Sequence, residues 1–183
     1  MERYRIVEDV GVYFVTFTVV EWLPVFINEA ACKIVTYSLN FCVQKKYLGV
    51  NTYVIMPTHL HATLFDTDFD SERLKQTLDD FRKFTGRQLA DYAAQHLPKC
   101  FTEVFQSHAG EDRKRRFWQP TRHPVGIFTE EFWIQKVDYI HHNPCRKGLV
   151  LLPEAWRFSS ASYWQARTPN DVQLTDIGWG DRY

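Results

Sequence analysis

The stretch that decides the fold is YVIMPTHLHATLF, residues 53–65. It is rich in β-branched and aromatic residues, which favour strands that pack on at least one side. Pro57 and the threonine after it interrupt the run and indicate a short, tight link. The sequence therefore predicts a hairpin, with one strand over 48–56 and the next over 59–65.

Two histidines stand near the middle of this stretch, which is an unusual choice for the inside of a sheet. Residues two apart on a strand point to the same side, so His59 and His61 project together, roughly 7 Å apart at Cα. Two imidazoles at this spacing can converge on one divalent metal ion, with further ligands from another element, water or a phosphate oxygen. By spacing alone, most such pairs are surface or core histidines, so the pair needs support from elsewhere in the chain.

The chain around the hairpin predicts a ferredoxin-like α+β fold of the split βαβ type. Its antiparallel sheet carries helices on one face and leaves the other available for a ligand. An extra C-terminal helix carries Tyr139. The expected elements are strands over 12–20, 48–56, 59–65 and 99–106, helices over 28–47, 70–96 and 129–143, and irregular chain over 107–124.

Capping residues mark the expected helix ends. Asn28, Asp70 or Ser71, and Thr129 each precede an apolar helical pattern and are preferred N-cap residues. The residue before a proline avoids the helical region, so Pro144 is expected to end the last helix.

Composition limits the class of protein. The 183 residues are 45% hydrophobic and 16% aromatic, with a formal net charge of +0, which predicts one folded domain over 1–183 with a core at about 12–165 and a polar tail. A neutral chain is not a strongly basic nucleic-acid binder, but the charge is uneven, with an acidic run at 66–72 and a basic run at 112–124. The chain has no apolar run long enough to span a membrane and no signal-peptide core, so we expect a cytoplasmic protein. Its four scattered cysteines are expected to be free thiols, mostly in the core.

The last helix supplies candidate partners for the histidine pair. Tyr139 and Asn143 are four apart and share one helix face. Asn143 offers a carbonyl oxygen as a metal ligand, and Tyr139 a hydroxyl that can act as a nucleophile. Taken singly, Tyr139 is more often a packing residue and Asn143 a helix-end residue. His141 and His142 are open to three interpretations: ligands, DNA contacts or solvated helix-end residues.

Other histidine chemistries fit less well. A histidine-triad nucleotide hydrolase needs a third alternating histidine, and position 63 is Thr63. A two-histidine phosphoesterase needs two H-x-T/S motifs, and the chain has one. The H-E-x-x-H helix of a zinc protease is absent.

Several motifs together resemble one family. In order along the chain they are YFVTFTVVEWLPVF, VIMPTHLHATLF, FWQP, KVDYIHHNPCRKGLV and WRFSSASYW. This set is similar to the HUH-type single-strand tyrosine transposases, especially their REP-associated branch, over about residues 12–165. Thr58 stands where many relatives carry Asn, and Cys145 where an aliphatic residue is commoner.

The resemblance implies specific roles. His59 and His61 match the metal-binding pair, Tyr139 the catalytic tyrosine, and Asn143 the residue that completes the metal site. Members of the family cleave single-stranded DNA near short hairpins, such as REP-like palindromes, form a 5′-phosphotyrosine, and rejoin the strand by the reverse attack. We expect Mg²⁺ in the cell. Mn²⁺ should be a good substitute, because imidazole suits Mn²⁺ better than Mg²⁺.

Basic and aromatic residues can hold a single strand by phosphate contact and base stacking. The candidates are Arg113, Lys114, Arg115, Arg116, Trp118, Arg122 and His123. The expected partner is single-stranded hairpin DNA and no membrane, with the protein acting as a monomer or homodimer. Two alternatives stay open: a domesticated protein that binds hairpins without cutting, and a metal-dependent phosphoesterase that does not need Tyr139.

Overall fold

The computed structural model describes residues 11–111, 114–120 and 124–179. Its centre is a four-stranded sheet in the order β2-β3-β1-β4, with all neighbours antiparallel. This is the order of a ferredoxin-like sheet, and the predicted fold class is confirmed. The strands are β1 (Val12–Thr18), β2 (Leu48–Met56), β3 (His59–Asp66) and β4 (Val125–Ile127).

Three of the predicted helices form close to their expected bounds. Their N-caps are Asn28, Asp70 and Thr129, each of which accepts a hydrogen bond from the backbone N–H three residues later. The helices are α1 (Glu29–Lys45), α2 (Ser71–His96), α3 (Lys99–Ser107), α4 (Glu130–Arg146) and α5 (Ala161–Ala166), with short 3-10 turns η1 (Val20–Trp22) and η2 (Pro153–Ala155).

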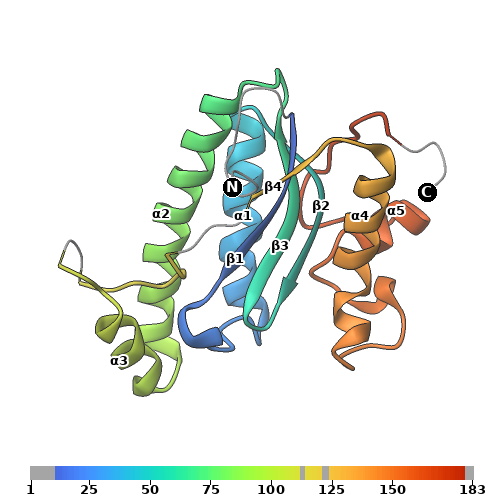
Figure 1. Ribbon diagram of the computed structural model, residues 1–183. Helices are drawn as coiled ribbons and strands as arrows, with labels where there is room; N and C mark the ends of the chain where they lie inside the picture. The colour runs from blue at the N-terminus through green and yellow to red at the C-terminus, as the bar shows by residue number, and fades with distance from the viewer. Residues whose placement is uncertain (1–10, 112–113, 121–123, 180–183) are drawn as a thin grey trace.

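The sheet separates two hydrophobic cores. Tyr13, Val15 and Phe17 of β1 point into the larger core, which α1 and α2 cover. Val12 and Phe14, which alternate with them, point into the smaller core against α4. Figure 1 shows α2 on one side of the strands and α4 and α5 on the other. The face expected to be open is thus partly covered by α4.

The fourth strand is not where the sequence predicted it. Residues 99–106 fall within α3 instead, because Phe101, Val104 and Phe105 recur at helical spacing and pack together on the main core. The edge strand is the short β4, whose three residues pair with the start of β1. The strand prediction was wrong because it followed the residue types of this segment rather than the helical spacing of its apolar residues.

The prediction that Pro144 ends the last helix was also wrong. The helix continues to Arg146, and Gly148 follows with φ 69°, a left-handed conformation that glycine adopts readily. The Leu149 N–H donates to Pro144 O and the Gly148 N–H to Cys145 O, which is the Schellman pattern of helix ends. The stop signal is therefore the glycine.

Two further predictions from the sequence concern the cysteines and membrane-spanning helices. All four cysteines are free thiols; Cys32 and Cys42 are buried, Cys100 is exposed and Cys145 lies between. Within the described parts of the chain, no helix is both long and apolar enough to cross a membrane.

Candidate functional site

The two histidines lie side by side on the α4 face of the sheet. Leu60, Ala62 and Leu64 of β3 point into the main core, so strand alternation turns His59 and His61 the other way. Their ring centroids are 4.4 Å apart. His61 is only 6% exposed, which is more buried than a pair on an open sheet face would be.

Two threonines orient these rings. Thr16 Oγ1 is 2.8 Å from His61 Nδ1, and Thr58 Oγ1 is 2.8 Å from His59 Nδ1. Since both Nδ1 atoms are engaged, both Nε2 atoms remain for a ligand. In the tautomer that leaves the Nε2 lone pair free, the ring Nδ1–H donates to the threonine oxygen, as metal-binding histidines commonly do. Thr16 was missed by the sequence reasoning, because only the register of β1 against β3 places it opposite His61.

Burial keeps the histidines neutral. It lowers the pKa of His61 to about 3, with a further contribution from His59, and the pKa of His59 to about 4. It also lowers the pKa of His141 to about 4. His141 Nε2 is 2.8 Å from Ser160 Oγ at the start of α5, so this histidine has a separate hydrogen-bond partner.

These pKa values predict that acid destabilises the metal-free protein. An unfolded histidine takes up a proton below pH about 6.5, whereas His61 does not until about pH 3, and His59 and His141 do not until about pH 4. Stability is therefore fully present above pH 6.5 and falls as the pH falls, by about 1.4 kcal/mol per pH unit for each group. Urea unfolding in EDTA at pH 7.5 and 5 should show a loss of about 6 kcal/mol, about 2 kcal/mol from each of the three histidines.

The control for this prediction is His141→Gln, which removes one of the three titrations. We expect about two thirds of the parent's pH dependence from it. A free energy of unfolding that stays constant between pH 7.5 and 5 would contradict the prediction.

Helix α4 brings Tyr139 to the histidines. The Tyr139 and His61 ring centroids are 5.3 Å apart, and Phe14 contacts both rings. Tyr139 is 38% exposed, so its side chain is open to an incoming ligand. Trp133, Val137 and Ile140 of the same helix pack into the smaller core and fix its position.

Asn143 lies one turn further along α4, with its side chain buried. It is 4% exposed, and its Oδ1 has no hydrogen-bond partner among the described residues. Tyr139 contacts His61, and the charge of Lys147 acts on His59. The segment from Tyr139 to Lys147 therefore runs along the two histidines, and Asn143 lies midway along it. A buried amide oxygen without a partner is costly and fits a ligand that is not a protein group.

Positive charge borders the tyrosine. Lys136 Nζ is 4.8 Å from the centre of the Phe14 ring, and the Arg146 guanidinium carbon is 5.5 Å from that of Tyr139. Arg146 also pairs with Asp138 at 2.9 Å. Cations beside this tyrosine favour an anionic ligand such as a phosphodiester.

The donor set fits a divalent metal with open positions. The described residues contain no group of three or more His, Cys, Asp or Glu side chains that could hold a metal ion, so a third donor must be of another type. The available donors are the two imidazoles and the Asn143 amide oxygen, which is unpaired and buried. The amide oxygen suits hard ions such as Mn²⁺ or Mg²⁺, imidazole suits Mn²⁺ better than Mg²⁺, and three protein donors leave room for water or phosphate oxygens.

The candidate DNA-binding residues differ in their environments. Arg113, Arg122 and His123 lie outside the described residues. Lys114 is exposed, and Arg115 pairs with Asp91 at 2.5 Å. Arg116 is half-buried, and its Nε has no hydrogen-bond partner within the described ranges.

Trp118 is a core residue, and the prediction that it stacks on bases was wrong. It is 3% exposed, stacks on Phe26 and contacts Phe17, and its Nε1–H donates to Thr85 Oγ1 at 3.0 Å. The aromatic character of FWQP therefore serves packing between α2 and the sheet.

This packing predicts a large stability effect for Trp118→Ala. Removing a fully buried Trp costs about 3–5 kcal/mol through lost burial and the cavity left behind. Urea unfolding measures this change. Trp22→Ala is the control, because Trp22 is exposed and its loss should change the free energy of unfolding by less than about 0.5 kcal/mol. Equal stability of the Trp118→Ala variant and the parent would contradict the assignment of Trp118 to the core.

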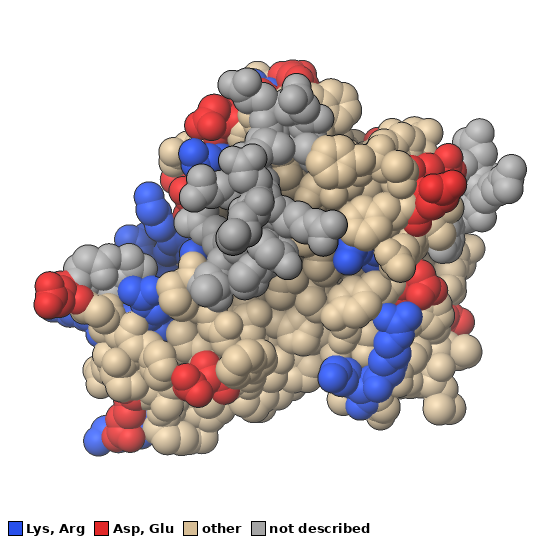
Figure 2. Space-filling model, in the orientation of Figure 1, with Lys and Arg blue, Asp and Glu red and all other residues tan. Residues whose placement is uncertain are grey.

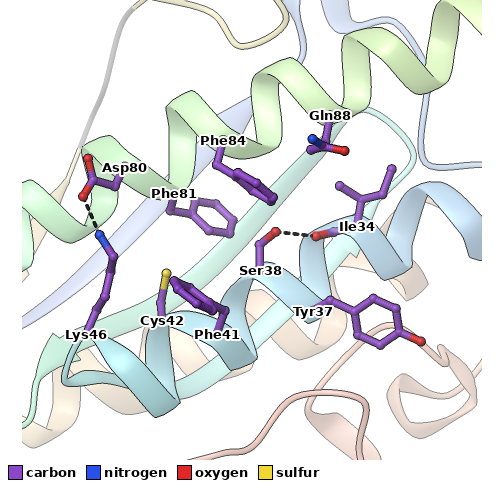
Figure 3. Close-up of a pocket in the computed structure, with 10 residues that line it drawn as sticks. All are labelled: Ile34, Tyr37, Ser38, Phe41, Cys42, Lys46, Asp80, Phe81, Phe84 and Gln88. Atoms are coloured by element: carbon purple, nitrogen blue, oxygen red, sulfur yellow. Dashed lines mark hydrogen bonds and ion pairs between the residues drawn. The ribbon is translucent and has the colours of Figure 1, made fainter.

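Two hollows lie away from the histidines. One has a volume of about 640 Å³ and lies between α1 and α2, where Phe41, Phe84 and Tyr37 line it and Lys46 pairs with Asp80 (Figure 3). The other, about 630 Å³, lies between α2 and residues 114–120. The histidine pair lines neither hollow.

Comparison with known proteins gives a match at the level of structure. No protein-family model matches the sequence, and no curated protein matches it. Among solved structures, the chain is similar to a REP-associated tyrosine transposase bound to a REP hairpin, with a TM-score of 0.60 and 20% identity, over 100% of this chain and 99% of that one. The two chains share one fold from end to end, which confirms the fold that the sequence motifs implied.

Proposed function

We propose that this protein cleaves and rejoins single-stranded DNA beside short hairpins, with Tyr139 as the nucleophile. One observation carries the proposal: a half-exposed tyrosine contacts His61 of a paired, neutral His59–His61 site.

The chain's own residues account for the strand transfer. Tyr139 Oη attacks the scissile phosphorus and loses its proton to solvent, forming a bond to the 5′ phosphate. The bond to the 3′ oxygen breaks, and that oxygen leaves with a proton as a free hydroxyl. Rejoining is the reverse attack by a 3′-hydroxyl, and the phosphotyrosine conserves the energy of the phosphodiester.

His59, His61 and Asn143 would hold Mg²⁺, or Mn²⁺ as its substitute. A bound divalent ion supplies Lewis-acid polarisation of the phosphate and neutralises charge on the transferring group. Thr16 and Thr58 hold the imidazoles in place, and Lys136 adds positive charge beside the site.

The structural neighbour supports the hairpin as substrate, because that protein is bound to a REP hairpin. The test is to incubate the protein with end-labelled single-stranded DNA that carries a hairpin and its flanks, in Mn²⁺, and to run a denaturing gel. We expect a DNA-linked protein band, and peptide mass spectrometry should find the nucleotide on Tyr139.

A second candidate is hairpin binding without cleavage, as in a domesticated relative. It predicts a stable complex on a native gel and no covalent band on flanking palindromes from the protein's own genome. Hydrolysis without any covalent intermediate would instead indicate a metal-dependent phosphoesterase.

A further inference from the structure

A basic groove runs between α2 and the segment 114–120, away from the histidine pair. It has a volume of about 630 Å³. Six cations and one carboxylate, that of Asp79, are among its lining residues. The cations are Arg82, Lys83, Arg87, Lys114, Arg115 and Arg116. Figure 2 shows Lys and Arg atoms gathered over this part of the molecule.

Sequence reasoning found only half of this charge. It named the run after α3 and missed the three cations of α2, which follow one another within DDFRKFTGRQ at residues 79–88. Lys83 and Arg87 are four apart, so they lie one turn apart on the same helix face, with about 6 Å of rise between them. The tertiary fold joins the two halves into one groove.

Close packing fixes the groove walls. A Cβ at Gly86 would come within 3.3 Å of Trp118, so glycine lets the segment approach α2 closely. Trp118 donates to Thr85, and Arg82 donates to the Gln119 carbonyl. The groove is therefore a built feature of the fold.

Its charge is only partly neutralised by the protein. Arg115 is paired with Asp91, but no described residue forms an ion pair with Lys83, Arg87 or Lys114. The half-buried Arg116 Nε has no hydrogen-bond partner among the residues that the structure describes. Such a donor is available to an anionic ligand.

We propose that this groove binds the phosphate backbone of the paired stem of a hairpin. The aromatic residues in its wall, Phe117 and Trp118, are both buried in the core, so the groove offers no stacking platform for unpaired bases. A duplex stem hides its bases and presents phosphates, which is what a groove of cations recognises.

The groove is also well placed for the proposed reaction. The Gln119 N–H donates to Thr18 O at 2.8 Å, and Thr18 pairs with His59 across the other side of β1. Two strand spacings, about 10 Å, therefore separate the end of the groove from the histidine strand. A stem in the groove would leave its single-stranded flank to cross this end of β1 toward Tyr139. This inference rests on the proposed function for its substrate.

The test measures binding alone, in EDTA, so that cleavage is not needed. A fluorescein-labelled hairpin with a fully paired stem is titrated with the full chain and with Lys83→Ala/Arg87→Ala at several salt concentrations. We expect Kd to rise roughly 30- to 100-fold near 0.1 M salt, and the slope of log K against log salt to fall by about 2. The matched control is Lys75→Ala/Lys99→Ala, which removes two exposed lysines outside the groove and should bind like the parent.

Three outcomes would overturn the proposal. They are unchanged hairpin binding by the groove variant, an equal loss in groove and control variants, and an equal loss for the hairpin and for an unpaired strand of the same length. The proposed function is measured separately by the covalent band at Tyr139, so either idea can fail while the other stands.

Discussion

Tyr139→Phe should fold and bind hairpin DNA like the parent, yet form no covalent adduct and release no cleaved strand. The substitution keeps the ring that contacts Phe14 and His61 and removes only the hydroxyl. A packing tyrosine tolerates this change at little cost, whereas a nucleophile does not. The measurement is a denaturing gel with end-labelled hairpin DNA and Mn²⁺, beside a native gel for binding.

Tyr163→Phe is the matched control. Tyr163 lies on α5, where it packs edge-on against Trp164 and beneath Arg167, and it is the next tyrosine along the chain. Its variant should form the adduct at the parent's level. A covalent band from Tyr139→Phe that is lost in Tyr163→Phe would move the nucleophile to α5.

The double variant His59→Ala/His61→Ala should lose cleavage by more than roughly 100-fold and lose Mn²⁺ binding. It removes both imidazole donors. Loss of only the groups that hydrogen-bond to a metal's ligands already lowers metal affinity or activity by about 10- to 100-fold. Metal binding is measured by calorimetry or by the Mn²⁺ electron paramagnetic resonance signal, without DNA. Full cleavage by the double variant would exclude a role for the pair.

The control for this variant removes two histidines elsewhere. His96 and His108 are remote from the site; His96 lies against Tyr92, and His108 pairs with Glu21. His96→Ala/His108→Ala should bind Mn²⁺ and cleave like the parent. Because His61 is buried, the stability of the His59→Ala/His61→Ala variant must be measured as well, and cleavage compared at a temperature where it is fully folded.

Local sequence determined the faces of the molecule. The period of two in HLHATLF turned His59 and His61 to one side, and the period in α4 set Tyr139 and Asn143 one turn apart. The N-caps marked where three helices begin. Each of these features depends on a few neighbouring residues, so the sequence alone could predict them, together with the fold class.

The tertiary structure decided which faces meet. Thr16 reached His61 only through the pairing of β1 with β3, and Asn143 lost its access to water only when α4 packed on the sheet. The packing of residues 114–120 against α2 buried Trp118 and joined the cations of α2 to those of residues 114–116. Such contacts join residues far apart in the chain, and their geometry follows from how whole elements fill the core, which no local period encodes.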